Sequence, residues 1–219
     1  MADGLVSFKV TLRSLGPMLL HNGRLADPLD PATRALADAS KKRGKSAEDH
    51  EAVAAAEFAG SLYYSTKIGR VAIPAMMIEA AIRDGGKAHK LGKTMRYSVS
   101  VRSTIGSEDA PVFDIPLDYD GPTKPEDLYA DQRFRDRRQV SVGQSKVMRT
   151  RPRFDEWSLT FIVDIDAESV DPAVVHRALE MAGRRVGIGD FRPTFGRFIV
   201  DSFEQVEGKH GGKRKSKAA

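Results

Sequence analysis

Residues 183–200 (GRRVGIGDFRPTFGRFIV) combine glycine and arginine in a pattern that favours contact with a phosphate backbone. Glycine permits positive φ and lets a backbone approach a ligand closely. The planar guanidinium group of arginine matches the geometry of phosphate and stacks on bases. We therefore expect a loop laid against nucleic acid, and the alternative is a helix C-cap followed by an ordinary turn with its arginines in water. The residues expected to contact the nucleic acid are Gly187, Gly189, Gly196, Arg192 and Arg197, with Phe191 available to stack on a base.

Residues 133–153 (RFRDRRQVSVGQSKVMRTRPR) carry eight lysines and arginines and one acid, Asp136. A stretch this basic repels itself unless it is solvated or bound to an anion. Interleaved apolar residues indicate a folded hairpin, and the alternation through residues 146–149 gives it a basic face. We expect nucleic acid as the partner, since one strand meets many phosphates; the alternatives are a solvated hairpin and a docking arm for an acidic protein. The cations are Arg133, Arg135, Arg137, Arg138, Lys146, Arg149, Arg151 and Arg153, and Phe134 and Met148 are candidates to wedge or stack on bases.

The signals for catalysis are weaker than those for binding. His21 lies near Asp27 and Asp30, and a histidine with a carboxylate can perform general acid–base chemistry or hold a metal. Aspartate beside proline and glycine is also a typical turn residue. None of the remaining histidines has a metal-ligand spacing to another, and the chain has neither a P-loop nor a dinucleotide-binding fingerprint. We therefore predict no metal and no cofactor.

The composition is that of a globular protein with a modest basic excess. The 219 residues are 41% hydrophobic, contain no cysteine and carry a formal net charge of +5. The absence of cysteine excludes disulfides and thiolate metal sites. No apolar run approaches the roughly 18 residues that span a bilayer, and the first ten residues lack the pattern of a secretory signal. We expect a soluble cytoplasmic protein without a membrane partner.

Hydrophobic periodicity predicts an α+β fold. Alternating residues predict strands at 5–14, 97–105, 157–165 and 196–206, and helical spacing predicts helices after Pro74 and after Asp171. A further helix is expected from Ser46 to about Tyr64. Setting aside residues 15–70 and 106–156 leaves the order strand, helix, strand, strand, helix, strand. This is a ferredoxin-like (RRM-like) core with large insertions, one of them the basic thumb-like hairpin. We expect a single domain over residues 1–208 and a disordered basic tail over residues 209–219.

Three segments make the chain resemble a known family. They are the opening strand with GPMLLHNG, the segment VAIPAMMIEAAIR with Pro74, Ile78 and Arg83 in place, and the glycine-rich GIGDFRPTFGRF. Together they resemble the RAMP superfamily, and within it the backbone subunits that polymerise along guide RNA in CRISPR effector complexes of antiviral defence. The basic 133–153 segment corresponds to the inserted thumb of that family. Glu79 departs from the family pattern, in which lysine is common.

The resemblance implies sequence-independent binding of single-stranded RNA, with single-stranded DNA as the alternative. It also implies a head-to-tail filament of copies of the chain, contact with other effector-complex subunits, and a phosphate contact from Arg83. Some members of the family cleave target RNA with an aspartate in the loop after the first strand, where Asp27 and Asp30 lie. A metal-dependent endoribonuclease is therefore one alternative. A protein-interaction scaffold of viral origin, which keeps the fold without binding RNA, is the other.

Overall fold

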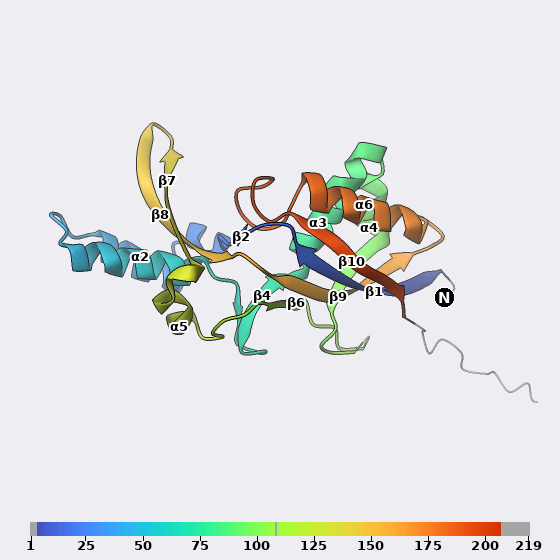
Figure 1. Ribbon diagram of the computed structural model, residues 1–219, viewed down its shortest axis with the longest axis horizontal. Coiled ribbons are helices and arrows are strands. Elements are labelled where there is room, and N and C mark those ends of the chain that lie inside the picture. The colour runs from blue at the N-terminus through green and yellow to red at the C-terminus, as the bar shows by residue number, and fades with distance from the viewer. Residues whose placement is uncertain (1–3, 108, 207–219) are drawn as a thin grey trace, which may run out of the picture.

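The computed structural model describes residues 4–107 and 109–206 and shows an α+β protein (Figure 1). Within these residues, two antiparallel sheets, one of seven strands and one of three, are combined with six α-helices. None of the described helices is long and apolar enough to cross a membrane. The tail predicted to be disordered, residues 209–219, lies outside the described residues.

The large sheet is built around two long antiparallel strands whose side chains alternate between core and solvent. Its strands, in sheet order, are β10 (Phe198–Gln205), β1 (Leu5–Ser14), β9 (Ser158–Asp166), β6 (Asp114–Asp118), β4 (Arg70–Pro74) and β3 (Tyr64–Ser65). The seventh strand, β5 (Val99–Ser103), shares one edge of β9 with β6. Val99 pairs with Ile165, whereas Leu117 pairs with Leu159 at the other end of β9.

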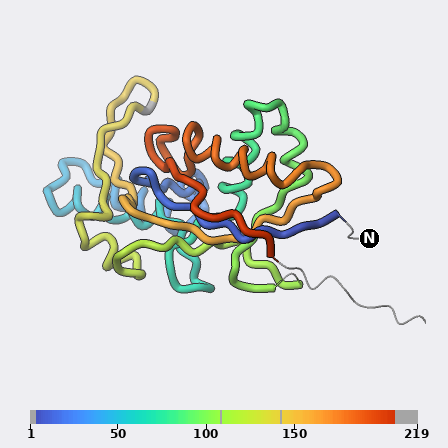
Figure 2. Tube along the Cα trace, turned by 45° about the vertical axis from the view of Figure 1, so that its right-hand side comes forward, coloured from blue at the N-terminus to red at the C-terminus, as the bar shows by residue number. Residues whose placement is uncertain are grey.

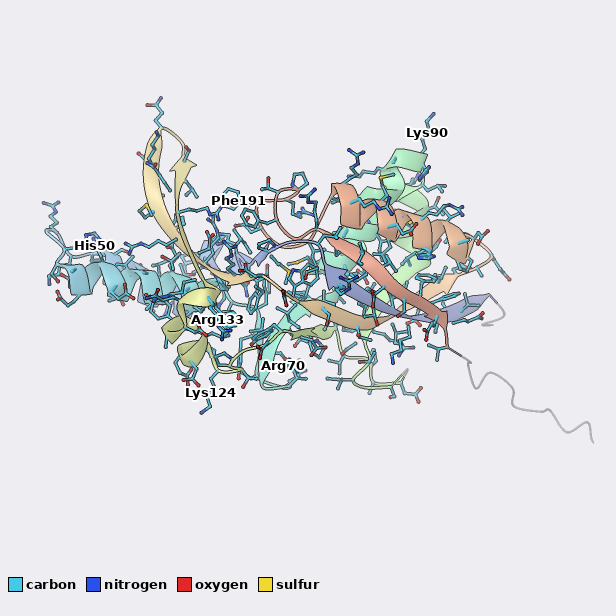
Figure 3. The ribbon with its side chains drawn as sticks, viewed as in Figure 1. His50, Arg70, Lys90, Lys124, Arg133 and Phe191 are labelled. Carbon is cyan, nitrogen blue, oxygen red and sulfur yellow. The ribbon has the colours of Figure 1, made fainter. Side chains whose placement is uncertain are left out.

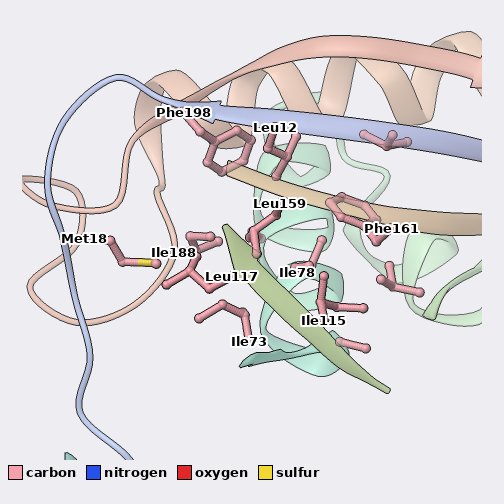
Figure 4. Close-up of a cluster of buried hydrophobic side chains, with 14 of the residues drawn as sticks. Leu12, Met18, Ile73, Ile78, Ile115, Leu117, Leu159, Phe161, Ile188 and Phe198 are labelled. Atoms are coloured by element: carbon pink, nitrogen blue, oxygen red, sulfur yellow. The ribbon is translucent and has the colours of Figure 1, made fainter. Parts of the chain in front are cut away.

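Helices cover one face of this sheet, as Figures 1 and 2 both show. They are α3 (Ala75–Gly86), η2 (Lys87–His89), α4 (Gly92–Ser98) and α6 (Pro172–Arg185). The apolar sides of α3 and α6 meet the alternate residues of β9, and these side chains form the core (Figure 4). The two helices approach closely at Gly85, where a Cβ atom would lie 2.0 Å from the carbonyl oxygen of Ala178.

The two predicted insertions form most of the other end of the molecule. Residues 15–70 contain β2 (Met18–Leu19), η1 (Gly23–Ala26), α1 (Pro31–Ser40), α2 (Ala47–Ser61) and β3. Residues 106–156 contain β6, α5 (Pro125–Ala130), η3 (Gln132–Phe134), β7 (Arg135–Val142) and β8 (Ser145–Phe154). The predicted hairpin is present as β7 and β8, and β2 pairs with β8 to complete the three-stranded sheet. The hairpin projects away from the large sheet next to α2 (Figure 1).

Local sequence signals predicted several elements correctly. The β9 alternation is confirmed, since Leu159, Phe161, Val163 and Ile165 are fully buried. The side chain of Asp171 caps α6 by accepting a hydrogen bond from the backbone N–H of Ala173 at 2.8 Å. The other confirmed cap is the Ser46–Asp49 capping box at the start of α2.

Two element predictions were wrong in detail. The region 15–34, predicted as a loop, contains the start of α1, because Asp30 and Pro31 act as an N-cap and a first-turn proline. The strand predicted over 97–105 begins only at Val99, because residues 92–98 form the short helix α4.

Candidate nucleic-acid interface

The glycine-rich loop, residues 187–197, joins α6 to β10 and is fixed against β2. The backbone N–H of Asp190 donates to the carbonyl oxygen of Leu19 at 2.8 Å, and that of Gly196 donates to Pro17 at 2.8 Å. Within the loop, the N–H of Ile188 donates to Gly196 at 2.9 Å. Met18 and Ile188 are fully buried at the end of the core beside the loop (Figure 4). The loop is therefore a docked part of the fold.

The three glycines of this loop are explained by contacts inside the protein. All three have positive φ, with values of 75° at Gly187, 83° at Gly189 and 73° at Gly196. A Cβ atom at Gly189 would lie 2.5 Å from the Leu19 carbonyl oxygen, and one at Gly196 would lie 1.7 Å from that of Ile188. Gly187 follows the last turn of α6, and its N–H donates to Ala182, as expected for a glycine C-cap. Their positions are those that the C-cap and turn interpretation predicts, so we remove the three glycines from the proposed ligand contacts.

The arginines around this loop are exposed and unpaired. Among the described residues, none of the four takes part in an ion pair. They are Arg184, Arg185, Arg192 and Arg197. Sequence reasoning assigned only the last two to the site, because the first two lie in the last turn of α6, where cations also stabilise the helix dipole.

Phe191 lies at the centre of this surface, next to the base of the hairpin (Figure 3). It is 40% exposed, and its φ of 54° places a large non-glycine residue in the left-handed region. Such a conformation costs on the order of 1–3 kcal/mol and is found mostly at functional sites. The guanidinium carbon of Arg151 lies 4.7 Å from the Phe191 ring centroid, and that of Arg138 lies 5.8 Å from it. The fold thus brings the glycine-rich loop and the basic hairpin together, as one surface.

The two faces of the hairpin differ in what they contact. Cross-strand partners share a face. The pairs Arg138 with Arg149 and Asp136 with Arg151 are therefore on one face, which we call the inner face because Arg138 and Arg151 reach Phe191. The outer face carries Met148, which is 51% exposed, together with Arg137 and Lys146.

Acids from elsewhere in the fold neutralise most of the hairpin arginines. Arg149 pairs with Glu57 at 2.5 Å, and Arg151 pairs with Asp190 at 2.7 Å. The same holds for Arg133 with Asp131, Arg135 with Glu51, Arg138 with Asp136, and Arg153 with Asp155. In the described part of the chain, only Arg137 and Lys146 of this segment lack an ion pair. The self-repulsion inferred from a single acid in the segment is therefore absent in the fold.

Two of these ion pairs are buried and lie close to His21. Glu57, which is 3% exposed, also accepts a hydrogen bond from the Thr150 backbone N–H at 2.7 Å. Arg151 is 8% exposed, and its buried Nη1 has no hydrogen-bond acceptor among the described residues. The ring of His21 is open to solvent on one side. Even so, its partial burial lowers its pKa, an effect opposed by Asp190 and reinforced by the two arginines. His21 is therefore uncharged at neutral pH.

The carboxylates expected to act with His21 have structural roles instead. Asp30 caps α1 by accepting from the Ala32 N–H at 2.8 Å, and its hydrogen bond with Arg24 lowers the pKa of the Asp30 carboxyl. Asp27 accepts from the Leu29 N–H at 2.9 Å, as in an Asx turn. No group of three acids or histidines in residues 4–107 and 109–206 could hold a metal ion.

Two further predicted residues lie away from this surface. Phe134 is 5% exposed and packs against Tyr119 and Phe154, so it cannot reach a base without leaving the core. Arg83 lies at the end of α3 with other cations, which include Lys90 (Figure 3). The departure at Glu79 also has a structural explanation, because its Oε1 accepts a hydrogen bond from the Val101 backbone N–H at 2.9 Å.

Neither a scan against protein-family models nor a search of curated proteins finds a significant match to this chain.

Replacing Gly189 with alanine should destabilise the protein through the contact with Leu19. Gly143, in the hairpin turn, is the matched control: its φ is 60°, and a Cβ there would meet nothing within 4 Å. Both substitutions carry the strain of alanine at positive φ, so their difference isolates the clash. We expect Gly189→Ala to be less stable than Gly143→Ala by about 1–3 kcal/mol in urea denaturation. Equal stabilities would show that the loop is not held against β2 as described.

Replacing Glu57 with alanine should be costly because it leaves Arg149 and the Thr150 N–H without their buried partner. We expect a loss of about 2–3 kcal/mol of unfolding free energy. Glu51 is the control on the same helix, since it pairs with Arg135 but its side chain is 54% exposed. Glu51→Ala should cost less than about 1 kcal/mol. Similar losses for both variants in chemical denaturation would contradict the assignment of Glu57 as the main link between α2 and the hairpin.

Proposed function

We propose that the protein binds single-stranded nucleic acid, which we expect to be RNA, across the glycine-rich loop and the inner face of the β7–β8 hairpin. The observation that carries this proposal is Phe191. Its ring is exposed, its backbone is held in a costly conformation, and Arg138 and Arg151 lie over it. An aromatic ring held in this way can stack on any base, because every base has a π-face.

Affinity in this proposal comes from phosphates. The four unpaired arginines of the loop region lie on both sides of Phe191 in the sequence, and their guanidinium groups are free to pair with a strand that stacks on that ring. Contacts of this kind carry no sequence information. The proposal is therefore for sequence-independent binding, with a strong dependence on salt.

The ion-paired arginines of the inner face have a different role in this proposal. Arg138 and Arg151 are already matched by carboxylates, so they add little net charge and instead hold Phe191 in place through cation–π contacts. The buried Nη1 of Arg151 is a donor that a phosphate oxygen would satisfy once Phe191 moves aside. Arg137, Lys146 and Met148 on the outer face are available to a more distant part of the strand, or to another copy of the chain.

The topology supports a more specific proposal. Four antiparallel strands in the order β10-β1-β9-β5, with α3 and α6 on one face, have the arrangement of a ferredoxin-like (RRM-like) core. With the projecting hairpin, this arrangement supports the resemblance to the RAMP superfamily. We therefore propose that the chain is a repeated backbone subunit of a CRISPR-type effector filament. The hairpin would contact the neighbouring subunit in a head-to-tail assembly, which leaves open ends and can grow along RNA.

Replacing both Arg192 and Arg197 with alanine should weaken binding equally on oligo(U) and oligo(C). The slope of log affinity against log salt should fall by about 0.7 for each phosphate that the variant no longer neutralises. Arg133→Ala is the control, because Arg133 is exposed but held by Asp131 beside α5. Fluorescence anisotropy at several salt concentrations measures all three proteins. An unchanged slope in the double variant would exclude the loop as the electrostatic site, and salt-insensitive association with another protein would favour the scaffold alternative.

Purified wild-type protein should not cleave RNA with Mg²⁺ or Mn²⁺, because Asp27 and Asp30 are used as caps and are not assembled with His21 into a metal site. Labelled RNA analysed on denaturing gels, with and without metal, tests this expectation. Metal-dependent products that disappear in Asp27→Ala or Asp30→Ala would contradict it and establish the endoribonuclease alternative.

A further inference from the structure

A second group of cations gathers at the end of α3, in η2 and in α4. These residues surround a shallow hollow of about 480 Å³. In Figure 3, Lys90 of this group lies well away from Phe191, at the far end of the helical layer. The residues that line the hollow are Arg83, Lys87, Lys90, Gly92, Lys93, Arg96 and Tyr97.

The charges of this hollow are not neutralised by the fold. Lys87 pairs with Asp84 at 2.7 Å. The other four cations form no ion pair with any residue in the described ranges, and no carboxylate is among the lining residues. This is the opposite of the hairpin, where acids from distant segments pair with most of the arginines. Cations gathered in this way repel one another and attract an anion.

The turn that presents these cations is well defined. The N–H of Lys90 donates to the Lys87 carbonyl oxygen at 3.0 Å, and that of Leu91 donates to Gly86 at 3.0 Å. Lys90 has a φ of 62°, a left-handed conformation that is uncommon for a residue with a side chain. Gly92 allows the turn to fold back, since a Cβ there would lie 3.2 Å from the Arg83 carbonyl oxygen. The cations are thus held near one another by a fixed backbone.

Tyr97 adds an aromatic surface to this charged hollow. It is 75% exposed, whereas Met95, two residues earlier, is 2% exposed and packs α4 against Gly86 of α3. Packing of α4 therefore does not account for the tyrosine ring. An exposed ring among cations is the combination with which proteins stack a base and neutralise its flanking phosphates. A lipid surface would require apolar side chains to insert, and Tyr97 is the only aromatic or aliphatic side chain among the lining residues.

We propose that this hollow is a second binding site for single-stranded nucleic acid, separate from the glycine-rich loop. One base stacks on Tyr97, and Arg83, Lys90, Lys93 and Arg96 contact the phosphates on either side of it. The volume of the hollow lies within the range of pockets that bind small molecules, about 300–1,000 Å³, so it suits one nucleotide and leaves the rest of the strand outside. This site stands independently of the function proposed above, because no residue is common to the two surfaces.

Tyr97→Trp gives this site its own signal. The only natural tryptophan, Trp157, is 3% exposed and is shielded from the ligand. Titration with oligo(U) of eight nucleotides should quench the new tryptophan by at least twofold. Adding Lys93→Glu and Arg96→Glu to this variant should weaken the quenching at least tenfold with an unchanged circular dichroism spectrum. Adding Arg192→Ala and Arg197→Ala, which alter the loop, should leave the quenching unchanged.

Other results would overturn the proposal. They are the absence of quenching in the folded Tyr97→Trp protein, equal quenching after charge reversal, and full competition by millimolar inorganic phosphate, which would indicate a simple anion site. A response to phosphatidylserine vesicles without any response to oligo(U) would assign the surface to a membrane instead. Ultraviolet crosslinking of wild-type protein to the same oligonucleotide, with Tyr97 as the expected adduct, checks the result without a substitution.

Discussion

The two-residue strand β2 joins the parts on which the proposed interface depends. Leu19 pairs with Arg153 of the hairpin, and its carbonyl oxygen accepts a hydrogen bond from Asp190 of the glycine-rich loop. Met18 and Leu19 are both fully buried, so neither connection can loosen without exposing apolar surface. Because a hairpin and a loop from distant parts of the sequence meet on this short strand, Phe191 can lie among arginines of both. Without β2, the hairpin and the loop would be separate basic segments with no common surface.

Electrostatic pairing then separates the cations by role. Where an arginine is buried, the fold supplies an acid, as in the pairs of Arg149 with Glu57 and Arg151 with Asp190. Unpaired buried charges are very costly, so these pairs are needed for the hairpin to pack at all. Arginines left without acids lie on the surface of the loop, and there they remain available to phosphates. The position of the acids therefore indicates which cations hold the structure and which can bind a ligand.

Local patterns predicted the elements whose causes are local. Alternation identified β9, and the cap residues Asp171 and Ser46 identified two helices, because each signal acts within a few residues. The pairing of Glu57 with Arg149 joins residues 92 positions apart, and no local pattern reports it. The same limit explains Phe134, since its interleaving with arginines suggested a surface residue while its partners Tyr119 and Phe154 lie in other segments. For the glycines, the pattern predicted the correct conformation and the wrong cause, because a carbonyl of the protein occupies the space that was assigned to a ligand.

The central claim is that a single strand lies over Phe191 between the loop and the hairpin. Its most direct test is photocrosslinking of the wild-type protein to RNA that contains 4-thiouridine, followed by mass spectrometry of the crosslinked peptides. The account predicts adducts at Phe191 or its immediate neighbours, with further adducts in peptides from residues 133–153. A strand that crosslinks efficiently elsewhere, but at neither the loop nor the hairpin, would contradict it.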